Sequence, residues 1–163
     1  MKKVGIVMGS DSDKDVALKA VDVLKELGVP YEVHVYSAHR TPEEAAEFAK
    51  GARENGFGAI ISIAGMAAHL GGVIAAYTTL PVVGVPVRSA GLGGLDALLA
   101  TVQMPSGIPV ATVAVDGAAN AALLCCEMLA LNDEELSAKL DARREAGRTK
   151  VLEKNRRIEE ELN

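Results

Sequence analysis

Short apolar runs rich in β-branched residues alternate along this chain with longer stretches rich in alanine and charge. Five runs have the length of a strand: residues 4–8, 31–36, 59–63, 82–87 and 110–115. The segments 14–27, 42–55, 67–77, 95–102 and 118–131 are helical candidates. Parallel strands need crossover connections, so this alternation predicts right-handed βαβ units. We therefore predict a three-layer α/β/α fold with a five-stranded parallel sheet covered on both faces.

The first two helices carry their own boundary signals. Ser12 or Asp13 can cap the first helix, and Gly28 can end it in a left-handed conformation. Thr41 can cap the second helix, with Glu44 three residues later in the pattern of a capping box. The three glycines of residues 88–94 predict a mobile loop.

The composition changes at residue 132, which divides the chain into a catalytic α/β part, 1–131, and a helical extension of the same domain, 132–163. The extension is charged, and its sparse apolar residues are spaced for one helical stripe. They are Leu136, Leu140, Val151, Leu152, Ile158 and Leu162. Two interpretations stay open, a helix that packs on the protein or a partner and a helix in solvent.

The bulk composition excludes several classes of function. Aromatic residues are only 3% of the 163, and the formal charge is −5, so neither base stacking nor electrostatic attraction favours nucleic acid as a partner. No apolar segment is long enough to span a membrane, and we expect a cytoplasmic protein. The adjacent Cys125 and Cys126 lie in an apolar helical stretch, which predicts buried, reduced thiols.

Polar loops follow the first three predicted strands, at residues 9–13, 37–42 and 64–72. In open α/β sheets ligands bind outside the carboxyl ends of the strands, so these loops are expected to meet at one site. The first loop offers the Ser10 and Ser12 hydroxyls and backbone amides at a helix start, which suit a phosphate. Two carboxylates would repel that phosphate, so Asp11 or Asp13 should point elsewhere, toward ribose hydroxyls. A plain helix cap is the alternative.

His39 and Arg40 stand together after the second strand. Imidazole suits proton transfer near neutral pH, and the guanidinium fork suits a phosphate. A surface capping pair is the alternative interpretation. His69 lies among small residues, which favours a buried histidine bonded to a carbonyl, and His34 within a strand reads as structural. The histidines and cysteines lack the spacing of zinc sites, so no metal is predicted.

Five segments together resemble the PurE family, in order and spacing, from about residue 3 to about residue 131. They are residues 9–13, 37–42, 67–70, 81–87 and 103–112. The resemblance implies a class I member, which converts N5-carboxyaminoimidazole ribonucleotide to 4-carboxy-5-aminoimidazole ribonucleotide in de novo purine biosynthesis. It implies no cofactor, a ribonucleotide substrate and a homo-octamer with sites at subunit contacts.

The resemblance also implies roles for individual residues. His39 would be the acid and base, Ser10, Asp13 and Arg40 would bind substrate, and Ser12, Ser37 and His69 would line the site. Small residues such as Ala67 would let the backbone close around CO₂ released from the carbamate. Two positions depart from the family pattern: Met66 stands where glycine is common, and Gly71 where the loop usually reads Leu-Pro-Gly.

Two other functions remain open at this point. An aminoimidazole ribonucleotide carboxylase would use free CO₂ on almost the same site, although that class tends to carry lysine at the position of Arg40. A flavodoxin-like module that binds FMN or a nucleotide without catalysis would also fit the fold, and the scarcity of aromatic residues weighs against it.

Overall fold

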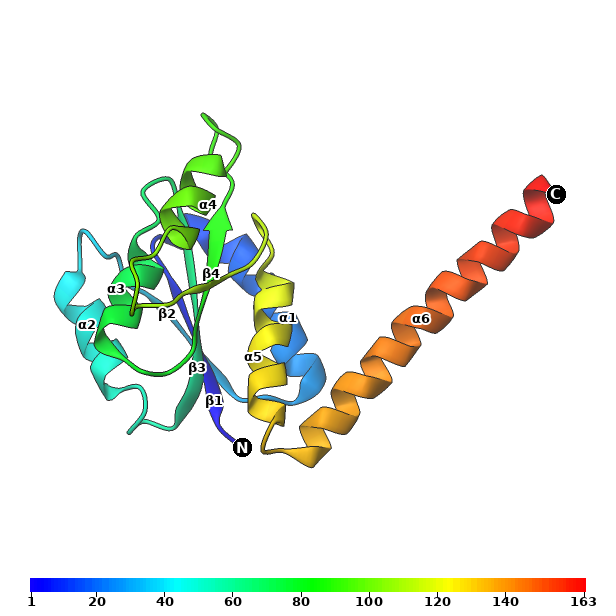
Figure 1. Ribbon diagram of the computed structural model, residues 1–163, viewed down its shortest axis with the longest axis horizontal. Coiled ribbons are helices and arrows are strands. Elements are labelled where there is room, and N and C mark those ends of the chain that lie inside the picture. The colour runs from blue at the N-terminus through cyan, green and yellow to red at the C-terminus, as the bar shows by residue number, and fades with distance from the viewer.

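Five parallel strands form the sheet in the computed structural model, which describes residues 1–163 (Figure 1). They are β1 (Lys3–Met8), β2 (Tyr31–Val35), β3 (Phe57–Gly65), β4 (Val82–Val87) and β5 (Ala111–Thr112). Their order is β2-β1-β3-β4-β5, so the direction of winding reverses between β1 and β3. This is the flavodoxin-like order, and the predicted fold class is confirmed.

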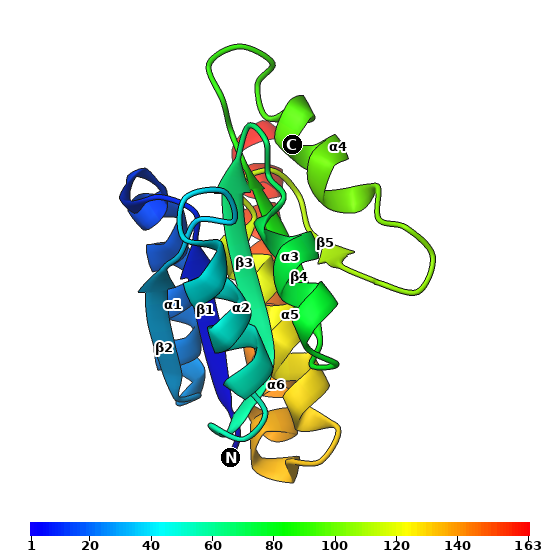
Figure 2. The ribbon, with the colours of Figure 1, turned by 90° about the vertical axis from the view of Figure 1, so that its left-hand side faces the viewer.

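Helices cover both faces of the sheet, as Figures 1 and 2 show. On one face, α1 (Lys14–Leu27) and α5 (Ala118–Ala130) bury the larger apolar core with the inward side chains of β1, β3 and β4. On the other, α2 (Pro42–Gly51) and α3 (Leu70–Tyr77) enclose a smaller core, and α4 (Leu95–Val102) packs near β4. Aliphatic side chains and alanines make up most of both cores, which lets helices and sheet approach closely.

Several predicted boundaries moved. The strand predicted at 110–115 is reduced to Ala111–Thr112, because it lies at the edge and pairs only with β4. The helix predicted from residue 67 begins at Leu70, since the amides of Ala68 and His69 donate to carbonyls only two residues earlier and form tight turns instead. The helix predicted to end at 55 ends at Gly51, before a turn.

The predicted cap of the first helix is wrong. A 3₁₀ turn, Asp11–Asp13, precedes α1, and the Ser10 hydroxyl accepts the Ser12 amide at 3.3 Å, whereas Asp13 makes no side-chain cap. Gly28 does end α1 in the left-handed conformation, with φ of 73°. Thr41 precedes α2, but its hydroxyl accepts the Ser37 amide at 2.8 Å, so no capping box forms.

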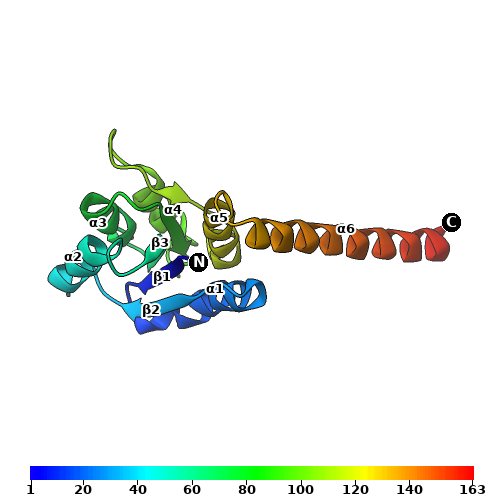
Figure 3. The same cartoon turned by 90° about the horizontal axis from the view of Figure 1, so that it is seen from below.

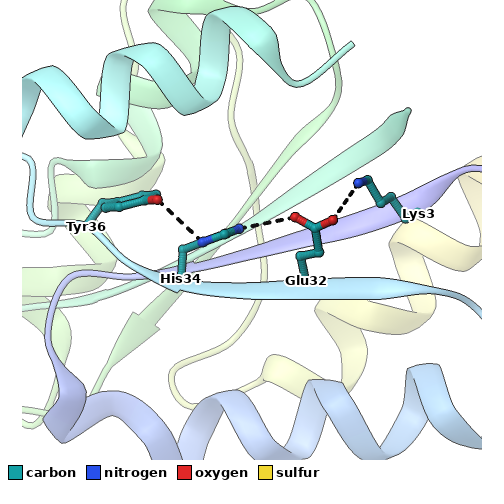
Figure 4. A network of polar contacts seen from close by, with 4 residues as sticks. All are labelled: Lys3, Glu32, His34 and Tyr36. Carbon is teal, nitrogen blue, oxygen red and sulfur yellow. Dashed lines mark hydrogen bonds and ion pairs between the residues drawn. The ribbon is translucent and has the colours of Figure 1, made fainter. Parts of the chain in front are cut away.

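Edge strand β2 carries a chain of polar contacts (Figure 4). Lys3 pairs with Glu32, and its hydrogen bond lowers the pKa of that carboxylate. A Glu32 carboxylate oxygen lies 3.4 Å from His34 Nε2, and His34 Nδ1 lies 3.4 Å from the Tyr36 hydroxyl. The His34 and Tyr36 rings stack on each other. These contacts connect His34 to neighbouring side chains of the fold, in agreement with the structural role predicted for it.

The C-terminal helix α6 (Glu134–Leu162) leaves the body of the protein as a long projection (Figures 1 and 3). Leu136 and Leu140 are buried, and Arg143 pairs with Glu26 of α1 at 3.1 Å. Val151, Leu152, Ile158 and Leu162 are exposed. The first half of the helix therefore packs on the protein, while the apolar side chains of the second half are exposed in the single chain. Neither α6 nor any other helix is long and apolar enough to cross a membrane.

Candidate functional site

The carboxyl ends of four strands open onto one cleft of about 620 Å³. The three loops expected to meet do so, because parallel strands end at the same edge of the sheet (Figure 2). A fourth loop, after β4, completes the wall. The lining residues are Gly9, Ser10, Ser12, Asp13, Ser37, Ala38, His39, Arg40, Ala64, Gly65, Met66, Ala67, Leu70, Val87, Arg88, Ser89 and Ala90.

His39 lines the cleft, and His69, which is not among the lining residues, contacts its ring. His39 Nε2 lies 2.9 Å from His69 Nδ1, and the rings stand edge to face with centroids 5.1 Å apart. The expectation of a buried His69 bonded to a carbonyl is wrong, since its side chain is exposed and its partner is His39. One ring must donate and the other accept, so the pair holds His39 in a defined orientation and can pass a proton.

The Ser37 hydroxyl organises the loop after β2. It accepts the backbone amides of His39 at 3.3 Å and Arg40 at 3.2 Å, and it lies 3.5 Å from Arg40 Nε. Arg40 Nη2 also donates to the Gly9 carbonyl at 3.3 Å, which ties this loop to the one after β1. A guanidinium is therefore held beside the first loop, where the sequence predicted a phosphate.

The loop after β1 presents hydroxyls and one carboxyl group. The Ser10 and Ser12 hydroxyls are 2.9 Å apart, and Asp13 is almost fully buried beneath them. Burial raises the pKa of Asp13, and the nearby Asp11 charge adds to this, while hydrogen bonds with Ser10 and Ser12 oppose it. Asp11 is exposed and does not line the cleft, so one carboxylate does point elsewhere.

Small residues form the wall after β3. Ala64, Gly65 and Ala67 line the cleft, and Met66 between them has a left-handed backbone with φ of 52°. Glycine adopts that conformation without steric cost, so methionine at this position has a less favourable backbone than glycine would have. Met66 is 68% exposed, so its side chain stands at the mouth of the cleft rather than filling it.

Arg88, Ser89 and Ala90 line the cleft from the loop after β4, and sequence reasoning did not assign them to the site. The strand-end rule that selected the other three loops, applied after residue 87, would have found them. The base of this loop is anchored, because the Ser89 hydroxyl donates to the Asp96 carboxylate at 3.0 Å.

The two cysteines lie away from the cleft. Both are fully buried in α5, as predicted, and burial raises the pKa of Cys126 to about 11 and that of Cys125 further. No three histidine, cysteine, aspartate or glutamate side chains are grouped in a way that could hold a metal ion.

Comparisons with known proteins agree on one family. A family model described as AIR carboxylase matches residues 3–150. The chain is 56% identical over 157 residues to the N5-carboxyaminoimidazole ribonucleotide mutase of Pyrococcus horikoshii, which covers 96% of this chain and 89% of that protein. It is 55% identical over 152 residues to the N5-carboxyaminoimidazole ribonucleotide mutase of Bacillus subtilis, and the match covers 92% of this chain and 94% of that protein. A crystal structure of Treponema denticola PurE superposes with a TM-score of 0.87 at 30% identity, over 95% of this chain and 97% of that one.

Proposed function

Since the chain belongs to the AIR carboxylase family, also called PurE, we propose that its cleft carries out the N5-carboxyaminoimidazole ribonucleotide mutase reaction of purine biosynthesis. The protein is then an isomerase. The observation that carries this conclusion is the identity of 55–56% to named mutases over nearly the whole chain. Those relatives favour the mutase over both alternatives left open by the sequence, the carboxylase and the flavin-binding module.

The reaction needs one group that can both give and take a proton. Loss of CO₂ breaks the bond between the carbamate carbon and the exocyclic nitrogen, which takes a proton. The ring carbon of the electron-rich aminoimidazole then attacks the CO₂ and later loses its own proton, so the net proton count does not change. We assign both transfers to His39, which lines the cleft and is held by His69 at 2.9 Å.

The remaining polar residues fit the ribonucleotide part of the substrate. Arg40, with Ser10 and Ser37 beside it, supplies charge-assisted and neutral hydrogen bonds for the phosphate. Asp13 lines the same part of the cleft as Ser10 and Ser12, and we assign its carboxyl group to the ribose hydroxyls. Ser12 lines the floor beside Ser10.

Containment of CO₂ is the main catalytic task, because recapture must be faster than escape. Ala64, Gly65 and Ala67 in the wall after β3 carry no bulky side chain, so at these three positions the substrate can approach the backbone closely. The released CO₂ can therefore stay in contact with the carbon that recaptures it.

We also propose the homo-octamer that the family resemblance implies. The exposed apolar side chains of the outer half of α6 have no partner within the chain, and a second copy would cover them.

Carbon-isotope labelling tests the mutase proposal. With the carbamate as substrate and labelled bicarbonate in the medium, label should enter the product far more slowly than product forms, because the same carbon returns to the ring. Label that reaches the product at the full rate of turnover would instead establish the carboxylase reaction. The decarboxylated ribonucleotide with bicarbonate is the control substrate, and it should react more slowly than the carbamate.

A further inference from the structure

The cleft contains a second arginine that no step of the proposed reaction uses. Arg88 follows β4 and lines the cleft, and its side chain is 68% exposed. Its backbone amide donates to Asp116 Oδ1 at 2.9 Å, and its Nε lies 3.4 Å from Asp116 Oδ2. One carboxylate thus holds both the main chain and the start of the guanidinium, and neither Nη atom has a hydrogen-bond partner within the chain.

Asp116 is itself held in an unfavourable conformation. Its φ is 59°, and apart from Met66 it is the only residue other than glycine with a positive φ. Its amide donates to the Pro86 carbonyl at 2.9 Å, so it clamps the end of β4 from the loop after β5. Strained residues of this kind persist where surrounding structure holds them. Met66 lines the cleft, and Asp116 contacts Arg88, which also lines it.

Arg88 and Arg40 lie on opposite sides of the cleft. Arg40 follows β2 and Arg88 follows β4, with β1 and β3 between them in the sheet. Three strand spacings place the two backbones roughly 14 Å apart, a gap that two long side chains and one ribonucleotide can fill.

The substrate and product of the proposed reaction each carry two anionic groups at opposite ends, a phosphate and a carboxylate. With the phosphate assigned to Arg40, Ser10 and Ser37 beside β1 and β2, the base extends toward β3 and β4. We propose that Arg88, positioned by Asp116, binds the carboxylate group of the substrate and product through its free Nη atoms. This inference rests on the proposed mutase function and deepens it.

The contact would act in binding rather than in chemistry. A guanidinium stabilises the carboxylate before CO₂ leaves and again after it is recaptured, but it gains nothing at the stage of neutral CO₂. Arg88 would therefore select carboxylated ribonucleotides over the decarboxylated one, and its loss should raise KM without lowering kcat.

The test compares two ligands on the same variants by titration calorimetry. In Arg88→Gln, the Kd of the carboxylated product should rise about tenfold, the lower range for a charge-assisted hydrogen bond at an exposed site. The Kd of the decarboxylated ribonucleotide should stay within about twofold, which also reports that the cleft keeps its shape. Arg53→Gln, the same change at an arginine outside the cleft, should alter neither.

Asp116→Asn tests the positioning role. It should reduce the ratio of the two affinities in the same direction but less, because the cation stays while its anchor weakens. Equal weakening of both ligands by Arg88→Gln would assign the side chain to the phosphate or to loop structure and overturn the proposal, as would no weakening of either. A parent protein that binds the product but does not form it from the carbamate would refute the mutase function alone.

Discussion

Gly84 lies in the middle of β4, where α4 approaches the sheet, and replacing it with alanine should destabilise the protein. A Cβ at this position would overlap Thr101 Cγ2 and lie 3.0 Å from Val110 Cγ1. Thr101 is buried and its hydroxyl donates to the Ala97 carbonyl at 2.7 Å, so rotation away from the new methyl group would break that bond. Overpacking of this kind costs about 2 kcal/mol.

The same substitution should also lower activity, because it disturbs the cleft. Helix α4 begins directly after the loop that carries Arg88, so pushing the helix off the sheet moves that loop. A displacement of about 1 Å near a site can cost up to roughly a hundredfold in rate, and we expect at least about tenfold here. Urea unfolding measures the first effect, and turnover of the carbamate measures the second.

Gly147→Ala is the matched control. A Cβ at Gly147 would meet no atom within 4 Å, and the position is inside α6, where alanine favours the helix by about 1 kcal/mol. The free energy of unfolding should therefore not fall. A Gly84→Ala protein as stable and active as the parent would refute the claim that α4 packs against β4 as closely as described.

Three further predictions follow from other parts of the molecule. His39→Asn should abolish turnover but leave ribonucleotide affinity within about tenfold, and near-normal turnover would remove His39 from the mechanism. Deleting residues 149–163, beyond the anchored half of α6, should lower the mass seen by light scattering, and an unchanged mass would mean that this segment does not hold an assembly together. Cys126 should resist thiol reagents in the folded protein. Because its thiol is buried, the free energy of unfolding should fall as pH rises from about 9 to about 11. The sign follows because the unfolded thiol loses its proton first. Cys126→Ala should reduce that pH dependence without removing it, because burial of Cys125 acts in the same direction.

Much of the cleft could be predicted because its loops obey a rule of topology. Apolar runs of strand length marked β1 to β4, and the ends of parallel strands share an edge, so the loops that hold Ser10, His39 and Ala67 had to meet. The predicted helix cap in the first loop was nevertheless wrong. The capping side chain is that of Ser10, because a 3₁₀ turn precedes α1.

Contacts between distant residues depended on the tertiary structure. The bond between His39 and His69, 30 residues apart, requires two loops to approach at a set angle, and no local pattern encodes that angle. The pairing of Arg88 with Asp116 is of the same kind. The apolar stripe of α6 was visible in the sequence, but only packing against α5 and α1 determined which half is buried. The periodicity of the sequence determines which face of a helix is apolar. Which part of that face is buried depends on how far the rest of the folded chain extends along the helix.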